Sequence, residues 1–482
     1  MPEFDLLVVG GGPGGYVSAI RAAQRGLSVA VVEKERPGGV CLNWGCIPTK
    51  AMLRSAEVYE TVRAAADYGV YADNVRFDFS TVRHRKDGIV KELTNGVAGL
   101  LAANGVTVID GHARFTGPTA VDVYEVGPSP VSADGPRYAA APTTLRRQVT
   151  ARDVVIATGS VPARLPIPGA DLPGVITSDG AFGLTTVPDR IVIVGGSAVG
   201  AEWASLFAAF GSQVTIVEMQ DRLVPAEDRD IGVALGRSFA ERGISVLTGS
   251  TVTSISEVGG LRVAVAGPHA GEFDADVVLV GVGRTPNTAD LGLDQAGVAT
   301  DNRGFIPVDE RLRTNVEHVY AIGDVTGRAL LAHVASHQGL TAADVIAGHD
   351  TRTDYTAIPA ATFTHPEIAS VGLTESAAKA AGHEVITARF PFAALGRAKT
   401  FGDTEGFVKI VAGQRYQEVL GVHIIGPSAS DLITEGALAI TLEATLEDLA
   451  DTIHAHPTLG EIGMETALSA LGLPVHVAPR KR

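Results

Sequence analysis

Residues 4–33, FDLLVVGGGPGGYVSAIRAAQRGLSVAVVE, set the architecture of the chain. The run FDLLVV is short, continuous and β-branched, which is typical of a buried parallel strand. Gly10, Gly12 and Gly15 follow in the spacing G-x-G-x-x-G, and a second strand ends in Glu33, 18 residues after Gly15. Strand, glycine turn, helix, strand and terminal acid together predict a dinucleotide-binding unit. In such a unit the pyrophosphate lies at the helix N-terminus and the acid binds a ribose hydroxyl.

The same pattern recurs in residues 191–218. The strand IVIVGG leads into Gly195, Ser197 and Gly200, a helix follows, and the strand SQVTIVE ends in Glu218. Ser197 stands where the first unit has a glycine, which puts the tightness of this second site in question but not its existence. Two such units in one chain predict two bound dinucleotides with electrons passing between them.

The acid of the second unit also indicates which nicotinamide cofactor binds. A carboxylate at Glu218 would repel the 2′-phosphate of NADP, so it favours NAD. Arg222 could reverse this preference, but we interpret it as a solvated loop arginine.

The only two cysteines of the chain lie in residues 38–50, GGVCLNWGCIPTK, as Cys41 and Cys46. Cytosolic cysteine pairs are more often catalytic or metal-binding than structural. A zinc site would need two further ligands at suitable spacing, and none lies nearby, so we expect no metal site. A redox disulfide needs only these two cysteines. The alternative is a pair of buried apolar thiols.

The spacing of the two cysteines favours a redox pair. Residues i and i+5 of a regular helix have Cα atoms roughly 8 Å apart, whereas a disulfide tolerates at most about 7 Å. The pair therefore predicts a distorted helical turn, which Gly38, Gly39 and Gly45 can accommodate. Such strain makes a disulfide easier to reduce.

Composition defines the broad class. The chain has a net charge of −15 and no basic block, so nucleic acid and anionic membranes are poor partners. No apolar run reaches the length of about 18 residues that a membrane-spanning helix needs. The first strand starts by Phe4 and leaves no room for a signal peptide, so we expect a cytoplasmic protein.

Two further strands lead to turns. DVVIATGS (153–160) enters a glycine turn, and VYAIGDV (319–325) brings a strand to Asp324. Ligands of parallel sheets bind at the carboxyl ends of strands, so Asp324 is a candidate ligand-binding residue. The alternative is a helix or turn cap. Residues 127–148, rich in Pro, Ala and Ser, are interpreted as an extended surface hairpin or loop without chemistry.

From about residue 351 the pattern changes. IASVGLT, GFVKIVA and EVLGVHIIG alternate as antiparallel strands do, and helices follow. Thr445 and Asp448 form a capping box, and Leu446, Leu449 and Ile453 are expected to point inward.

The last of these helices leads into HAHPTLGE, which contains His454, His456 and Glu461. A lone histidine is usually structural. Here His456 precedes a proline and an acid lies five residues on, which suits an imidazole held and polarised by a carboxylate.

Taken in this order, these motifs resemble the pyridine nucleotide–disulfide oxidoreductases. The resemblance rests on CLNWGCIPTK, the doubled fingerprint, VYAIGDV and HPTLGE, and it covers essentially the whole chain. GGGPGGYVSAI and LAHVASHQG are similar to the branch that oxidises dihydrolipoamide, although Val334 and Ser336 differ from the lysine and glutamate expected there. The implied fold is α/β, with two Rossmann-like dinucleotide-binding domains and an α+β dimerisation domain with an antiparallel sheet. The implied domains are FAD-binding (1–160, with a return segment at 284–350), NAD-binding (161–283) and dimerisation (351–482).

The resemblance also implies roles for individual residues. Cys46 corresponds to the thiol beside the flavin, and Cys41 to the thiol that exchanges with substrate. His456, oriented by Glu461, corresponds to the acid–base and would project from the partner subunit of a homodimer. Lys50 and Glu202 resemble an ion pair beside the flavin. The implied ligands of the two cofactors, FAD and NAD, are Gly10, Gly12, Gly15, Glu33, Lys50, Thr158, Gly159, Asp324, Ala332, Gly195, Gly200, Glu218, Gly283 and Arg284.

The implied reaction passes electrons from dihydrolipoamide through the cysteines and FAD to NAD. The implied partners are a lipoyl domain as substrate, a second copy of the chain, and the core of a 2-oxo acid dehydrogenase or glycine cleavage complex. Three alternatives stay open at this stage. A glutathione-type reductase should prefer NADPH and carry basic residues near position 218, a mercuric reductase would need extra cysteines, and a docking subunit of a multienzyme complex would need no intact redox site.

Overall fold

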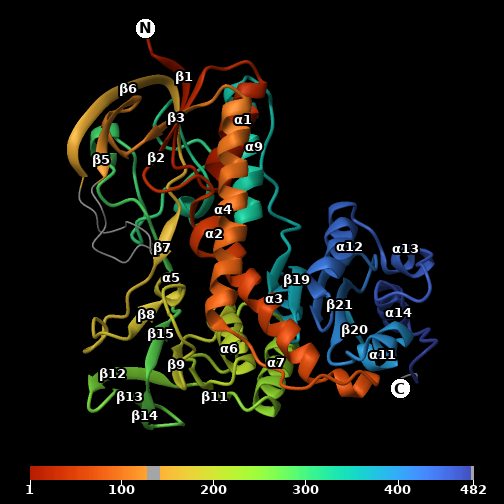
Figure 1. The fold of residues 1–482 in the computed structure, drawn as a ribbon. Helices are drawn as coiled ribbons and strands as arrows, with labels where there is room; N and C mark the ends of the chain where they lie inside the picture. Colours follow the sequence, from red (N-terminus) through yellow and green to blue (C-terminus); the bar gives the residue numbers. More distant parts are fainter. Residues whose placement is uncertain (127–141, 479–482) are drawn as a thin grey trace. The chain divides into compact units, whose positions relative to one another are not determined.

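The computed structural model describes residues 1–126 and 142–478. The chain forms two compact units, each built from segments that are distant in sequence (Figure 1). Unit 1 comprises Met1–Arg164, Ile176–Thr186 and Val282–Asp354, and unit 2 comprises Leu165–Val175, Val187–Gly281 and Tyr355–Arg482. The domain boundaries that the sequence predicts, at 160, 283 and 350, stay a prediction. No helix within the described ranges is long and apolar enough to cross a membrane.

Unit 1 is organised around a parallel sheet of buried aliphatic strands. Its order is β3-β2-β1-β6, with β17 also paired to β6, and β5 and β4 continue it as antiparallel strands. Leu6, Leu7 and Val8 have no exposed surface, as the continuous apolar run predicts. The strands are β1 (Phe4–Val9), β2 (Val29–Glu33), β3 (Thr107–Asp110), β4 (His112–Gly117), β5 (Ala120–Val126), β6 (Pro142–Ile156) and β17 (Val319–Ala321).

Helices of unit 1 pack against one another through a close backbone approach. A Cβ atom at Gly339 of α9 would lie 2.5 Å from the Gly14 carbonyl oxygen of α1, so glycine is required there. The helices are α1 (Pro13–Gln24), α2 (Gly39–Trp44), α3 (Cys46–Arg63), η1 (Ala65–Tyr68), α4 (Phe79–Ala103), α5 (Ser178–Ala181), α8 (Leu293–Ala296), η2 (Gly323–Thr326) and α9 (Ala332–Ile346). The short strands β7 (Ser160–Pro162) and β16 (Arg284–Pro286) pair antiparallel.

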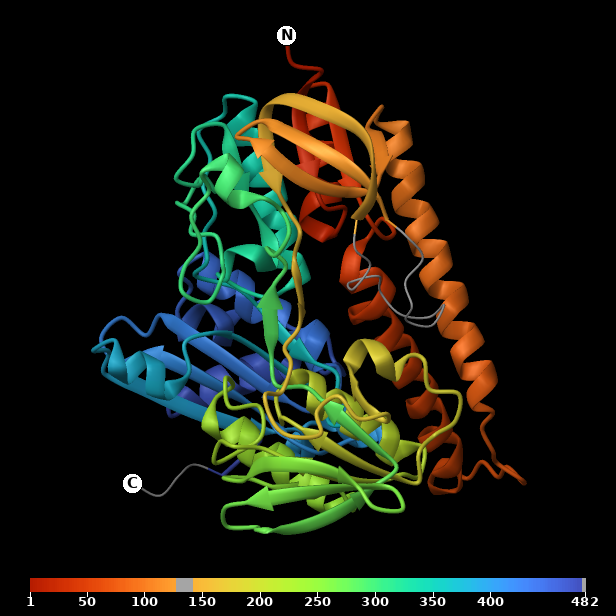
Figure 2. The ribbon, with the colours of Figure 1, turned by 90° about the vertical axis from the view of Figure 1, so that its left-hand side faces the viewer.

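Unit 2 contains the second parallel sheet, in the order β11-β10-β9-β15. Its elements are β9 (Arg190–Val194), α6 (Ala198–Ala209), β10 (Gln213–Val217), α7 (Arg229–Glu241), β11 (Ser245–Leu247) and β15 (Val277–Val280), and β8 (Val175–Thr177) begins in this unit. A three-stranded antiparallel sheet, drawn green in Figure 2, is formed by β12 (Thr251–Glu257), β13 (Leu261–Ala266) and β14 (Gly271–Ala275).

The rest of unit 2 is an antiparallel sheet with helices, as expected beyond residue 351. Its order is β18-β19-β22-β21-β20. The strands are β18 (Ala360–Thr362), β19 (Ile368–Gly372), β20 (Val385–Pro391), β21 (Phe407–Gly413) and β22 (Val419–Ile425). The helices are α10 (Glu375–Ala380), η3 (Phe392–Ala394), α11 (Gly396–Phe401), α12 (Ala429–Thr441), α13 (Leu446–Asp451) and α14 (Glu461–Ala470).

A buried ion cluster joins the parallel and antiparallel parts of unit 2. Lys409 of β21 is 3% exposed, and its Nζ lies 2.8 Å from carboxylate oxygens of Asp228, Asp230 and Glu375. Asp228 also caps α7 by accepting a hydrogen bond from the Asp230 N–H. Because a buried charge needs a partner, this cluster ties the start of α7 to β21 and α10.

The C-terminal part confirms one expectation about local structure and corrects another. The capping box of Thr445 and Asp448 is confirmed, and Leu446 and Leu449 are buried. The expectation for Ile453 is wrong, because its side chain is 96% exposed. Helix α13 ends at Asp451, so the helical spacing that would turn Ile453 inward does not extend that far.

The segment interpreted as a hairpin or loop is described only in part. Residues 142–148 are the first half of β6 and pair antiparallel with β5, which fits a hairpin. Residues 127–141 lie outside the described residues.

Candidate redox and nucleotide-binding site

Cys41 and Cys46 lie on either side of a break between two helices. Cys41 is in α2 and Cys46 is the first residue of α3. Gly45 separates them with φ of −138° and ψ of −109°, and Gly38 precedes α2 with a φ of 97°. A Cβ atom at Gly45 would lie only 3.1 Å from the Val40 carbonyl oxygen. The predicted distortion of the helical turn is therefore confirmed.

The break brings the two sulfur atoms together. Both cysteines are thiols in the structure, and the Cys41 side chain is hydrogen-bonded to Cys46. This hydrogen bond and burial raise the pKa of the Cys41 thiol, while the nearby charge of Lys50 lowers it in part. Cys41 therefore keeps its proton at neutral pH.

The two fingerprint turns have the same geometry. Gly10 and Gly195 have φ angles of 105° and 104°, which only glycine adopts readily. A Cβ atom at Gly15 would lie 1.8 Å from the Gly10 carbonyl oxygen, and one at Gly200 would lie 1.8 Å from the Gly195 carbonyl oxygen. The first and third positions therefore require glycine in both units.

The middle position of the fingerprint is less demanding in this chain. A Cβ atom at Gly12 would meet only the Gly39 Cα, at an ordinary 3.8 Å. Ser197 occupies the equivalent position with a φ of −76°, which suits any residue. The backbone of the second turn thus tolerates its serine, and the departure leaves the turn intact.

Each terminal acid of a fingerprint hydrogen-bonds to its own turn. Glu33 accepts from the Gly11 N–H at 2.6 Å and from the Glu35 N–H at 2.7 Å. Glu218 accepts in the same way from the backbone N–H groups of Gly196 and Gln220. Burial raises the pKa of Glu33, although these N–H groups oppose the shift. The carboxylates are thereby held at the strand ends, where a ribose hydroxyl would be bound.

Asp324 belongs to a network that links two strand ends of unit 1. The Ser160 hydroxyl donates to Asp324 Oδ2 at 2.5 Å, and the Arg284 Nε donates to the same hydroxyl at 2.6 Å. Arg284 also donates to the Ser160 carbonyl oxygen at 2.7 Å. The structure therefore brings Asp324 and Arg284 together. It adds Ser160, which the sequence argument did not single out, although it is the last residue of the run DVVIATGS.

Several features of this site suit a dinucleotide cofactor. The N-terminal amides of α1, α6 and α9 receive no side-chain cap from the described residues, which leaves them able to bind an anion. Ala332, the first residue of α9, is one of the expected ligands. The Thr158 Oγ1 is buried without a hydrogen-bond partner among the described residues, and Thr158 adjoins the Gly10 turn. The turn at Thr158 and Gly159 is held by the later segment of unit 1, because the Asn287 N–H donates to the Gly159 carbonyl oxygen at 2.9 Å.

His456 and Glu461 form the expected imidazole–carboxylate pair. His456 Nδ1 lies 2.8 Å from Glu461 Oε1, and the His456 side chain is 79% exposed. Glu461 Oε2 accepts from the Thr458 N–H at 2.8 Å. Burial raises the pKa of Glu461, but this N–H, the His456 hydrogen bond and the charges of His456 and His454 outweigh it, so the pKa lies below its ordinary value. The carboxylate stays ionised and orients the ring.

Lys50 and Glu202 lie in different units. Glu202 of α6 is buried and accepts a hydrogen bond from the Phe363 N–H at 2.9 Å. Lys50 lies one turn into α3 from Cys46 and contributes a positive charge near Cys41. Their pairing stays a prediction. Gly283 has a φ of 118° beside Arg284, and its contact with a cofactor also stays a prediction.

Comparison with known proteins agrees with this geometry. A profile of the family described as pyridine nucleotide-disulphide oxidoreductase matches residues 4–339. A profile of the dimerisation domain of the same family matches residues 358–467. The chain belongs to the pyridine nucleotide-disulphide oxidoreductases, enzymes that bind FAD and a pyridine nucleotide, and it carries their dimerisation domain.

Full-length relatives narrow the class. The chain is 44% identical over 477 residues to a dihydrolipoyl dehydrogenase of Geobacillus stearothermophilus, with 98% of each chain covered. It is 41% identical over 482 residues to the dihydrolipoyl dehydrogenase of Chlamydia muridarum, with 99% of each covered. This similarity places it among the dihydrolipoyl dehydrogenases, which are flavoprotein disulfide oxidoreductases.

Solved structures share the fold. LpdA from Mycobacterium tuberculosis superposes with a TM-score of 0.85 at 29% identity, covering 96% of this chain and 98% of that one. The HOCl-induced flavoprotein disulfide reductase RclA from Escherichia coli superposes with a TM-score of 0.82 at 28% identity, over 96% of this chain and 99% of that one. The fold class expected from the sequence is confirmed.

Proposed function

We propose that the protein oxidises dihydrolipoamide, free or on a lipoyl domain, and passes the electrons through Cys41 and Cys46 to FAD and then to NAD. The observation that carries this proposal is the cysteine pair, whose side chains are held in hydrogen-bond contact across a glycine-lined helix break. Structural thiols need no such break.

The first step is deprotonation of a substrate thiol, because only the thiolate is an effective nucleophile. His456 is the base. Its Nδ1 is engaged by Glu461, so the other ring nitrogen, Nε2, takes the proton. Glu461 stabilises the imidazolium that forms, and its low pKa keeps it ionised while it does so.

The substrate thiolate then attacks Cys41 in the oxidised pair. The Cys41–Cys46 bond breaks, a mixed disulfide forms between substrate and Cys41, and Cys46 leaves as a thiolate. The second substrate thiol displaces Cys41 and closes the lipoamide disulfide, and Cys41 takes up a proton. The substrate loses two electrons and two protons, and the cysteine pair is left reduced.

The dithiol form of the structure supports these separate roles for the two sulfurs. The pKa of Cys41 is raised by its hydrogen bond to Cys46 and by burial, so Cys41 holds its proton. Bound FAD would supply a two-electron acceptor for the cysteine pair, and bound NAD would supply the final hydride acceptor.

The protein's own residues would hold both cofactors. The turns at Gly10 and Gly195 and the helix N-termini behind them would bind the pyrophosphates. Glu33 and Glu218 would bind ribose hydroxyls. Arg222 is engaged within its own loop, donating to Asp221 at 2.8 Å and to the Pro225 carbonyl oxygen at 2.8 Å, which supports NAD rather than NADP.

The assembly we propose is a homodimer in which His456 of one subunit completes the active site of the other. The dimerisation domain and the exposure of His456 support this arrangement. We further propose a cytoplasmic enzyme that serves the core of a 2-oxo acid dehydrogenase or glycine cleavage complex.

A steady-state assay with each disulfide and each nicotinamide tests the proposal. The purified holoenzyme should oxidise dihydrolipoamide with NAD, and should reduce lipoamide with NADH faster than it reduces glutathione disulfide. The His456→Gln variant should lose dihydrolipoamide oxidation by at least about 100-fold, since a positioned base contributes about that much or more. Turnover of glutathione disulfide alone would identify a different reductase.

A further inference from the structure

A second imidazole–carboxylate pair lies two residues before His456. His454 Nε2 is 2.7 Å from Glu435 Oε1 of helix α12. The His454 side chain is only 11% exposed, in contrast to His456. Its Nδ1 lies 2.9 Å from the Thr452 carbonyl oxygen. The His454 ring therefore faces an acceptor at each of its two nitrogens.

These contacts define where the protons lie. A carbonyl oxygen only accepts, so His454 Nδ1 carries a proton. Nε2 then faces the Glu435 carboxyl group, and their 2.7 Å separation is at the short end of the range for hydrogen bonds between nitrogen and oxygen.

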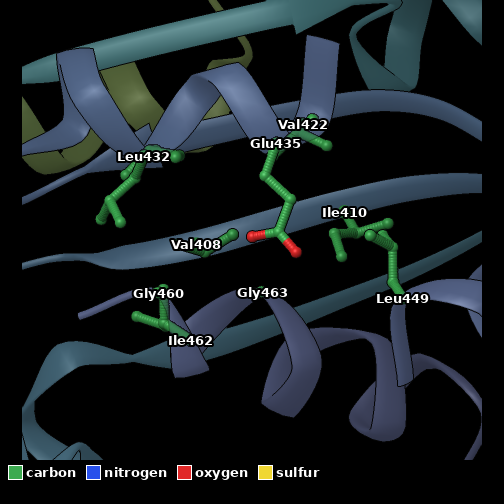
Figure 3. A pocket seen from close by; sticks show the side chains of 11 residues that line it. Val408, Ile410, Val422, Leu432, Glu435, Leu449, Gly460, Ile462 and Gly463 are labelled. Carbon is green, nitrogen blue, oxygen red and sulfur yellow. The ribbon is translucent and has the colours of Figure 1, made fainter. Parts of the chain in front are cut away.

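The surroundings are shaped for this pair. Figure 3 shows the Glu435 carboxylate pointing from α12 into a pocket toward the start of α14, with apolar side chains such as Val408 and Ile462 around it. A Cβ atom at Gly463 would lie 3.0 Å from Glu435 Oε2, and one at Gly460 would lie 3.6 Å from the His454 ring. Gly463 in the first turn of α14 thus leaves room for the Glu435 carboxylate, whereas the contact at Gly460 is an ordinary one. The Glu435 side chain is 32% exposed, and His454 supplies a hydrogen bond to it from within the protein.

The position of the pair in the chain gives it a consequence for His456. Helix α13 ends at Asp451 and α14 begins at Glu461, so the intervening segment has no regular hydrogen-bonding pattern to hold it. Beyond His456 it is anchored by Glu461 and by the Thr458 hydroxyl, which donates to the Ala455 carbonyl oxygen at 2.7 Å. Before His456 the Thr452 hydroxyl donates to the Asp448 carbonyl oxygen of α13 at 2.7 Å, and the bond between His454 and Glu435 is the anchor to α12.

We propose that His454 and Glu435 are positioning residues for His456. Their bond fixes the segment from Thr452 to His456 against α12, so that the His456 ring meets the substrate thiol in one orientation. The proposal rests on the proposed function, in which His456 is the base. Orientation of this kind affects the rate of proton transfer more than the binding of substrate.

The test compares Glu435→Ala with Glu435→Gln in the purified holoenzyme. The alanine variant removes the anchor, and kcat for dihydrolipoamide oxidation should fall about tenfold with KM changed less than threefold. The glutamine variant keeps a hydrogen-bonding group of the same size, and should retain kcat within about threefold. Reduction of the flavin by NADH does not use His456, and should be unchanged in both variants. If Glu435→Ala fails to bind flavin, His454→Gln replaces it. The kcat of His454→Gln should fall about tenfold, its KM should change less than threefold, and its flavin reduction by NADH should be unchanged.

The outcomes separate this proposal from the one on which it rests. His456→Gln is measured alongside, and if it retains near-normal dihydrolipoamide oxidation then the proposed function itself fails. If His456→Gln is inactive but Glu435→Ala keeps its kcat within twofold, the positioning proposal is overturned and the proposed function stands. Equal losses in Glu435→Ala and Glu435→Gln, accompanied by slower flavin reduction with NADH, would assign the pair a purely structural role and also overturn it.

Discussion

Replacing Lys409 by methionine should destabilise unit 2 more than any exposed lysine substitution. Lys409 is buried on β21 and makes three ion pairs of 2.8 Å, with Asp228, Asp230 and Glu375. Methionine has a similar length and no charge, so it fills the same space. The change therefore leaves the carboxylates clustered without their shared cation.

The size of the effect follows from this burial. Removing one partner of a buried ion pair costs about 3–5 kcal/mol, because the other charge is left uncompensated. Asp228 is as buried as Lys409, whereas Asp230 and Glu375 are partly exposed and will regain water. We therefore expect the lower end, about 3 kcal/mol. For a cooperative unit of this size that corresponds to a fall in the melting temperature of roughly 6–10 °C.

The assay is thermal unfolding of the flavin-loaded protein at fixed concentration. Lys379→Met is the matched control, because Lys379 is exposed and pairs with Glu375 across one helical turn. Such a surface pair contributes about 0.5 kcal/mol or less. A Lys409→Met melting temperature within about 2 °C of that of the control would refute the reasoning.

The same cluster predicts a dependence on pH. Hydrogen bonds from Lys379 and Lys409 lower the pKa of Glu375. Burial raises the pKa of Asp228, but its bonds to Lys409 and to two backbone N–H groups outweigh it and lower the pKa. Carboxyls with depressed pKa values stabilise the fold above their unfolded values of about 4 to 4.5, and the stabilisation is lost as the pH falls through the folded values. Lys409→Met should therefore lose less stability than the unchanged protein between pH 5 and pH 3, by about 1 kcal/mol or more.

Three further predictions concern the site. Cys46→Ser should abolish disulfide reduction yet retain bound flavin, and near-normal lipoamide turnover would rule out the redox assignment. NADH should be preferred over NADPH by at least about tenfold, roughly 1.4 kcal/mol, because of Glu218, and equal use of the two would count against that role. Gly200→Ala should abolish NADH-dependent flavin reduction while flavin stays bound, since the new Cβ would lie 1.8 Å from the Gly195 carbonyl oxygen. Gly236→Ala in α7 is its control, because nothing lies within 4 Å of a Cβ there, and comparable losses in both variants would contradict the argument.

Much of the fold was readable from local pattern. Strand β1 spans the predicted residues 4–9, and β2 and β10 end beside Glu33 and Glu218 as the fingerprints require. The apolar run of β1 leads into Gly10, whose φ of 105° suits glycine, so propensity, burial and turn geometry agree there. Ile453 was misplaced because hydrophobic spacing shows which residues would share a helix face but not where the helix ends.

The site was predicted unevenly. Cys41 lies close to Cys46 in sequence, and His456 lies close to Glu461. Spacing was therefore sufficient to predict the contact within each pair. Ser160 was missed, because its partners Asp324 and Arg284 are distant in sequence and a serine after a strand carries no signal of its own.

The amino-acid sequence alone specified two dinucleotide turns, a cysteine pair and an oriented histidine, because each of these lies within one recognisable motif of the chain. Folding added the contacts across long separations. Lys409 of β21 finds Asp228, 181 residues away, only once the parallel and antiparallel parts of unit 2 have packed. Buried charges must be paired, and which side chain provides the partner depends on how distant elements pack together, which local sequence does not encode.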